Sequence, residues 1–144
     1  MRLIMFIAVM AVGICYGAVT PLSQDKLKDY LANGAPFDFI LIDVRTSQEL
    51  TSAIGNAACK PYNLAWPDQF KVEALKIPKD QTVIIYCRSG GRAANAADFL
   101  ISNGYTNVYN AGGFMTWTGP TITPSEIKPF SLLPAPSMRA AGKK

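Results

Sequence analysis

The chain has 144 residues and a formal net charge of +4, a length that suits one hydrophobic core and is too short for two comfortable domains. The charge is too small to indicate a nucleic-acid partner, because no basic run or aromatic platform accompanies it. The absence of histidine excludes Ser-His and Cys-His catalysis within the chain and leaves no zinc pattern among three scattered cysteines. We therefore expect one domain, monomeric, without a metal or another cofactor.

The N-terminus has the pattern of a targeting segment. Arg2 supplies a positive charge, and residues 3–19 contain no charged side chain. That run is shorter than the roughly 20 residues of a membrane span, and the small residues Gly17 and Ala18 offer a cleavage boundary. We expect residues 1–18 to be a signal peptide for export to the periplasm. The alternative is a retained inner-membrane anchor, because no Ala-x-Ala site is present.

A domain is expected over residues 19–118, and it begins with a helix and a strand. Ser23 can cap a helix from about Gln24 to Ala32, and Asn33-Gly34 is a typical stop. Residues 37–44 are apolar apart from two aspartates, which predicts a buried strand.

Polar residues follow that strand. Asp43 and Arg45 leave its end, and we expect them to be a scaffold pair that supports a site at this edge, the alternative being a direct catalytic role. Residues 46–49, Thr-Ser-Gln-Glu, form a capping box for a short helix, which gives Glu49 a structural role. A further helix is expected from about Pro67, with four apolar positions, namely Phe70, Val72, Leu75 and Ile77.

The central stretch runs from Val83 to Arg92. Val83 to Tyr86 is an uninterrupted apolar run, as in a parallel-sheet strand covered on both faces, and Cys87 follows at its carboxyl edge. From Gly91 to about Ile101 the spacing of apolar residues predicts a helix that Asn103-Gly104 would end.

A strand, a glycine-containing loop and a helix N-terminus together form an anion site, because loop amides and the positive end of the helix dipole converge there. Cys87 lies at the head of this loop, beside Arg88 and close to Arg92. Such surroundings favour the thiolate, so we expect Cys87 to be a nucleophile. The alternative is a packed core cysteine, but two arginines and two glycines are unusual cover for a core thiol.

The loop Cys87-Arg88-Ser89-Gly90-Gly91-Arg92 resembles the active-site loop of the rhodanese (thiosulfate sulfurtransferase) family. Further matches occur in the right order: Asp43-Val44-Arg45 with Glu49 resembles an early Asp-Val-Arg-x-x-x-Glu signature, and residues 111–117 resemble a closing Gly-Gly-x-x-x-Trp segment. The match covers residues 22–117. One departure is the missing Gly-His pair of a turn expected near residues 52–58.

This resemblance implies a sulfurtransferase in which Cys87 is the catalytic residue. Thiosulfate or a similar small anionic donor would transfer its sulfane sulfur to Cys87, and cyanide or a thiol would accept it from the persulfide. Arg88, Ser89, Gly90, Gly91 and Arg92 would bind the donor, the arginines by offsetting its charge. Cys59 is expected to pack in the apolar interior, the alternatives being to resolve the persulfide or to pair with Cys87.

Two other functions remain open. A cysteine-loop phosphatase or arsenate reductase would use the same thiolate and arginine, although four residues between Cys87 and Arg92 make a smaller loop than the phosphatases of this fold have. A non-catalytic module of rhodanese fold, which carries sulfur or binds a partner, is the second.

The C-terminal part changes in composition. Residues 119–144 contain repeated prolines and end in basic residues, which predicts an extended, appended tail with little capacity for a core. Before it, helices and buried-type strands alternate along the chain. This order predicts an α/β fold with a small parallel sheet between two helical layers.

Overall fold

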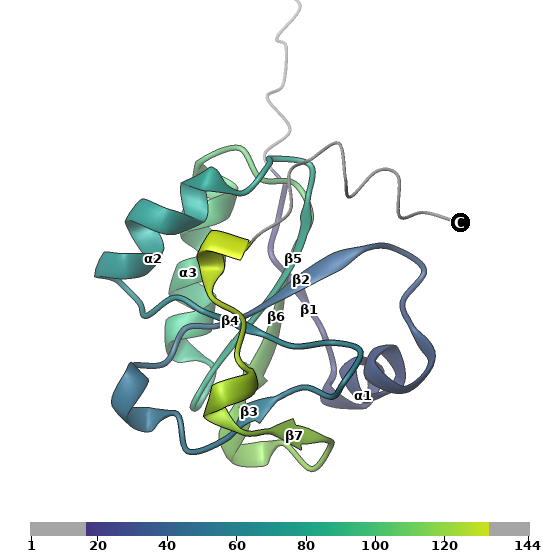
Figure 1. The fold of residues 1–144 in the computed structure, drawn as a ribbon. Coiled ribbons are helices and arrows are strands. Elements are labelled where there is room, and N and C mark those ends of the chain that lie inside the picture. The colour runs from purple at the N-terminus through teal and green to yellow at the C-terminus, as the bar shows by residue number, and fades with distance from the viewer. Residues whose placement is uncertain (1–16, 133–144) are drawn as a thin grey trace, which may run out of the picture.

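The computed structural model describes residues 17–132, whose central feature is a parallel sheet with helices on both faces (Figure 1). The strand order is β1-β6-β5-β2-β4, and every neighbouring pair is parallel. The strands are β1 (Thr20–Pro21), β2 (Phe39–Asp43), β4 (Tyr62–Asn63), β5 (Thr82–Cys87) and β6 (Val108–Gly113). The predicted α/β fold is confirmed, and the carboxyl ends of the strands meet at one edge.

Two apolar clusters cover the two faces of this sheet. Helices α2 (Asp68–Glu73) and α3 (Gly91–Ser102) contribute to one cluster, and helix α1 (Gln24–Asn33) contributes to the other. Along the central strand β5, Val83, Ile85 and Cys87 face the α2 and α3 side, while Ile84 and Tyr86 face the α1 side. All six residues of β5 are buried, as the apolar run predicted. Strands β6 and β2 lie on either side of β5, and an apolar cluster covers each face of the sheet.

The caps of α1 lie where the sequence placed them. The Ser23 hydroxyl accepts a hydrogen bond from the Lys26 amide at 3.1 Å. Gly34 ends the helix with φ of 85°, a left-handed conformation that suits glycine. Helix α3 likewise spans the predicted range and ends before Gly104, whose φ is 90°.

The helix that follows Pro67 packs through two of the four apolar positions that predicted it. Helix α2 is short and continues as the 3₁₀ helix η2 (Ala74–Lys76). Val72 and Leu75 are 66% and 41% exposed. The buried side chains of the segment are Phe70, Ala74 and Ile77. Their spacing of four and three residues is that of one helical face, and Val72 and Leu75 fall outside it.

The C-terminal segment is not the extended tail that its composition predicted, at least up to residue 132. Strand β7 (Thr121–Ile122) pairs with β3 (Ala53–Ile54) in a separate antiparallel sheet. Ile122 is buried in this pairing. The 3₁₀ helices η4 (Pro124–Glu126) and η5 (Phe130–Leu132) follow β7.

The same segment continues along the outer edge of the main sheet. The Lys128 amide donates to the Pro61 carbonyl at 2.9 Å, beside edge strand β4. The ring of Phe130 lies 5.7 Å from that of Tyr62 in an edge-to-face contact. Through these contacts the segment covers the outer edge of the main sheet at β4. The expectation of a core-free tail is therefore wrong for residues 119–132.

The expected signal peptide falls almost entirely on residues 1–16, which lie outside the described part of the chain, as do residues 133–144. Between Gly17 and Leu132 the structure contains no helix with the length and apolar character that a membrane crossing needs.

Candidate active site

Cys87 ends strand β5 and begins the loop that leads into helix α3. Its side chain is fully buried, whereas Arg88 and Ser89 are exposed. Gly90 has φ of 104° and forms the N-cap of α3, which directs its amide back to the Cys87 Sγ at 2.9 Å. A residue with a Cβ rarely adopts this conformation, so the glycine is needed for the turn. The predicted convergence of a loop amide and a helix N-terminus on the thiol is present.

A second segment supports the loop from behind. Gly113 of β6 pairs with Cys87, and a Cβ at this glycine would lie only 2.3 Å from the Arg88 carbonyl oxygen. Two residues later, in the 3₁₀ helix η3 (Phe114–Thr116), the Met115 amide donates to the same carbonyl at 3.0 Å. Strand β6 runs as far as Gly113, and this glycine permits close backbone contact with the loop.

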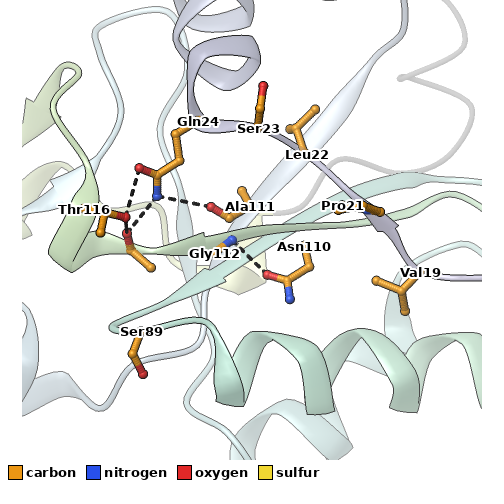
Figure 2. A pocket seen from close by; sticks show the side chains of 11 residues that line it. Val19, Pro21, Leu22, Ser23, Gln24, Ser89, Asn110, Ala111, Gly112 and Thr116 are labelled. Atoms are coloured by element: carbon orange, nitrogen blue, oxygen red, sulfur yellow. Dashed lines mark hydrogen bonds between the residues drawn. The ribbon is translucent and has the colours of Figure 1, made fainter.

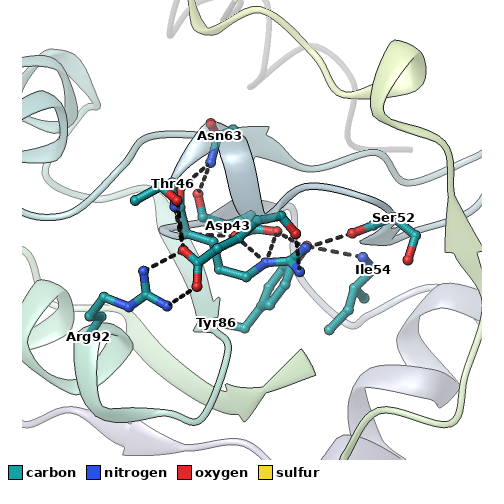
Figure 3. Close-up of polar contacts among 9 residues, drawn as sticks. Asp43, Thr46, Ser52, Ile54, Asn63, Tyr86 and Arg92 are labelled. Carbon is teal, nitrogen blue, oxygen red and sulfur yellow. Dashed lines mark hydrogen bonds and ion pairs between the residues drawn. The ribbon is translucent and has the colours of Figure 1, made fainter. Parts of the chain in front are cut away.

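Asp43 and Arg45 form a buried ion pair at the end of β2. The Arg45 guanidinium donates to both Asp43 carboxylate oxygens, at 2.6 to 3.0 Å, and to the Ser52 carbonyl at 2.7 Å (Figure 3). It also lies 4.4 Å from the ring centre of Phe114. Burial opposes the charged form, but the hydrogen bond and attraction to Asp43 raise the pKa of Arg45. The pair joins β2, the segment after it and η3.

Tyr86 belongs to the same buried group. Its hydroxyl accepts a hydrogen bond from the Ile54 amide at 3.0 Å. Burial, followed by the negative charge of Asp43, raises the pKa of Tyr86 well above its ordinary value. Tyr86 is therefore a neutral structural link between β5 and β3. Nothing in these contacts gives Asp43 or Arg45 access to a substrate, so their supporting role stays our interpretation.

The Glu49 carboxylate binds Arg92 of the loop, a contact that the sequence interpretation missed. Two parallel hydrogen bonds join the groups, at 2.7 and 2.8 Å (Figure 3). The predicted capping box is also present, since the Thr46 amide and hydroxyl both donate to Glu49. The hydrogen bond from Arg92 lowers the pKa of Glu49 to about 2, and the same bond raises the pKa of Arg92. In the sequence, the capping box already gave Glu49 a role within its own turn, so the ion pair with the distant Arg92 was not predicted.

The structure thus brings the predicted site residues to one place. Their side chains differ in whether they already have an ion-pair partner. Besides the larger effect of Glu49, the nearby Cys87 contributes to the raised pKa of Arg92. Arg92 is nevertheless engaged by Glu49. Arg88, in contrast, is exposed and has no ion-pair partner within residues 17–132.

Cys59 lies apart from the catalytic loop. It is half-buried and packs against the cluster on the α1 face, whereas Cys87 belongs to the opposite cluster. Both are free thiols. Burial raises the pKa of Cys59, although the positive charge of Lys128 opposes the effect. These surroundings agree with a packing role and give no support to pairing with Cys87.

A pocket of about 510 Å³ borders the loop on the side of β1. Ser89 lines it on the loop side, and Gln24 and Thr116 lie on the other (Figure 2). The Gln24 side chain donates to the Gly113 carbonyl at 2.8 Å and accepts from Thr116 at 3.1 Å, so it fixes the segment after β6. No lining residue is charged. The described residues also contain no cluster of three or more side chains suited to a metal ion.

A parallel sheet with a cysteine loop at its carboxyl edge is the arrangement of a rhodanese domain, and the family model for the rhodanese-like domain matches residues 23–119. The chain belongs to this family. A sulfurtransferase of Allochromatium vinosum is 35% identical over 101 residues, which cover 69% of this chain and 88% of that protein.

Two solved structures agree with the fold. A rhodanese with anions from E. coli has a TM-score of 0.51 and 27% identity, covering 60% of this chain and 99% of that one. The polysulfide-sulfur transferase homodimer from Wolinella succinogenes has a TM-score of 0.53 and 28% identity, covering 72% and 78%. Together with the family match, these relatives place the protein in the class of rhodanese-type sulfurtransferases.

Proposed function

We propose that the protein transfers a sulfane sulfur from thiosulfate or a similar small anionic donor to cyanide or a thiol, through a persulfide on Cys87. The observation that carries the proposal is the Cys87 sulfur at the head of a loop whose Gly90 amide points at it from 2.9 Å. The printed names of the Allochromatium and Wolinella relatives add support for sulfur transfer as the type of reaction.

In the first half-reaction the Cys87 thiolate attacks the outer sulfur of thiosulfate. A new sulfur–sulfur bond forms, the bond within thiosulfate breaks, and sulfite leaves with the bonding electron pair. In the second, cyanide attacks the terminal sulfur of the persulfide, and thiocyanate leaves while Cys87 returns to the thiolate. Loop amides stabilise the terminal, negatively charged sulfur in between.

The donor reaches Cys87 only if the cover of the thiol moves, because the side chain is fully buried. The two residues that follow Cys87 in the loop, Arg88 and Ser89, are exposed. We infer that Arg88 meets the anionic donor first and that Arg92, tied to Glu49, contributes less than the sequence alone suggested.

The test is the intact mass of the protein after incubation with thiosulfate. One sulfur atom, about 32 Da, should be added and should be lost again when cyanide is supplied, with release of thiocyanate. Cys87→Ser should abolish both steps, because a hydroxyl is not ionised near neutral pH and does not hold a transferable sulfur.

Cys59→Ser is the matched control and should take up sulfur like the wild type. Retention of sulfur by Cys87→Ser would refute the proposal. A protein that takes up no sulfur but hydrolyses an aryl phosphate would be a phosphatase of the related type, and one that does neither would be a binding module.

A further inference from the structure

The charges around Cys87 are largely paired before any substrate arrives. Three arginines lie on the loop or on elements packed against it. Asp43 pairs with Arg45, and Glu49 pairs with Arg92. The third, Arg88, is exposed. No charged residue occurs in η3, which supports the loop from behind. Among residues 17–132, Arg88 is therefore the loop arginine without an ion-pair partner.

The position of the Glu49 carboxylate is fixed independently of Arg92. The amide and hydroxyl of Thr46 donate to its Oε2 at 2.8 and 3.0 Å, which ties the side chain to its own 3₁₀ turn. Arg92 then meets both carboxylate oxygens. Each side chain of this pair is about one-third exposed or less, so solvent screens its field only in part.

We propose that Glu49 is a specificity-determining residue that, by neutralising Arg92, disfavours doubly charged sulfur donors relative to singly charged ones at Cys87. This inference rests on the proposed sulfur transfer and specifies the class of donor: monoanions such as organic thiosulfonates and persulfides. The reason is electrostatic. A dianion gains about twice as much as a monoanion from a free guanidinium, so neutralising Arg92 removes more stabilisation from the dianion than from the monoanion.

Glu49→Gln tests the proposal, with thiosulfate as the dianion and methanethiosulfonate as the monoanion. Glutamine still accepts the capping-box hydrogen bond, so the substitution removes the charge and keeps the turn. The readout is the ratio of kcat/KM for thiosulfate to that for methanethiosulfonate. We expect Glu49→Gln to raise this ratio about three- to tenfold, the size of a partly screened charge interaction. A change in thiolate fraction or in loop opening affects both donors and cancels in the ratio.

Glu126→Gln is the matched control, because Glu126 forms the same capping box with Thr123 but pairs with no arginine in the described part of the chain. Its ratio should equal that of the wild type. Glu49→Ala removes the charge and the cap together and should raise the ratio in the same direction. If Glu49→Gln lowers the activity with both donors equally, or leaves the ratio unchanged, Glu49 acts only by positioning Arg92 or the turn, and the proposal is wrong.

A second measurement does not depend on sulfur transfer. Iodoacetate, a monoanion, and iodoacetamide, which is neutral, both alkylate a thiolate, and mass spectrometry of the Cys87 peptide separates this reaction from that of other cysteines. Glu49→Gln should raise the ratio of the iodoacetate rate to the iodoacetamide rate about two- to threefold. An unchanged ratio overturns the inference whether or not the protein transfers sulfur. A raised ratio in a protein that forms no persulfide would refute the proposed function alone.

Discussion

The Glu49 carboxylate shows how one residue serves local and distant partners together. It closes the turn of η1 through Thr46 and holds the N-terminal turn of α3 through Arg92. Glu49 and Arg92 are 43 residues apart in the chain. Because the carboxylate must be ionised to form the ion pair with Arg92, its titration should appear in the stability of the protein.

We therefore expect an acid dependence that Glu49→Gln removes. The folded-state pKa of Glu49 is about 2, below the ordinary value of 4.5. A lowered folded pKa means that the stabilisation is complete above pH 4.5 and is lost as the pH falls towards 2. Wild type should exceed Glu49→Gln in free energy of unfolding by about 1 kcal/mol near neutral pH, a modest value because the pair is partly solvent-screened.

Urea unfolding at several pH values between 7 and about 2.5 would measure this difference, and linked titration predicts that it shrinks only in the acid range. A difference that stays constant over the whole range would show that the glutamine perturbs packing and not the ion pair.

At the scale of elements, the turn from β6 into η3 supports the loop that begins at Cys87. Gly113 pairs with Cys87, and Met115 binds the carbonyl of Arg88. Gln24 of α1 in turn binds the Gly113 carbonyl. The loop is thus held by elements that precede and follow it in the chain, and a small displacement of β6 should reach the thiol.

Gly113→Ala should lower the rate of sulfur transfer even in molecules that are correctly folded. The added Cβ would lie 2.3 Å from the Arg88 oxygen, so the loop carbonyl has to move. We expect kcat/KM to fall by at least about tenfold, as misplacement of reacting groups by a fraction of an ångström to 1 Å is costly.

Gly55→Ala is the matched control for this variant. Its Cβ would also meet backbone, 2.8 Å from the Cys59 oxygen, but away from the catalytic loop. Thermal unfolding should show that both variants are less stable than the wild type. Kinetics should show that only Gly113→Ala loses activity per folded molecule. Equal loss of activity in both would mean that the effect is one of general stability.

At the scale of the whole molecule, the segment after the family match belongs to the folded structure. The rhodanese-like match ends at residue 119, yet β7 pairs with β3 and Lys128 binds the edge at Pro61. The segment covers an edge of the main sheet and completes the small second sheet. It should therefore contribute to global stability.

Ile122→Ala should lower the free energy of unfolding by about 2–3 kcal/mol, since it truncates a buried side chain at the contact between β7 and β3. Val72→Ala, at a position 66% exposed, should change it by less than about 0.5 kcal/mol. Denaturant unfolding of the two variants makes the comparison. Equal stability of Ile122→Ala and wild type would show that the C-terminal segment is only loosely attached.

The sequence by itself determined the elements that depend on local patterns. Four such elements follow from residues close in the chain, and all are present in the structure. They are the apolar run of β5, the caps of α1, the capping box at Thr46 and the glycine turn before α3. The position of Cys87 at the end of a buried strand, in front of the loop that leads into a helix, follows in the same way, because period and capping are local properties.

Only the tertiary structure decided which of these residues are engaged with each other. Four features depend on segments that are distant in the chain. They are the Glu49–Arg92 pair, the contact of Gly113 with Arg88, the burial of Ala74 in place of Leu75, and the docking of Ile122. Composition predicted a tail from residue 119 onward because prolines disfavour regular structure. Composition carries no information about the strand edges that this segment covers, because such edges exist only once the sheet has formed.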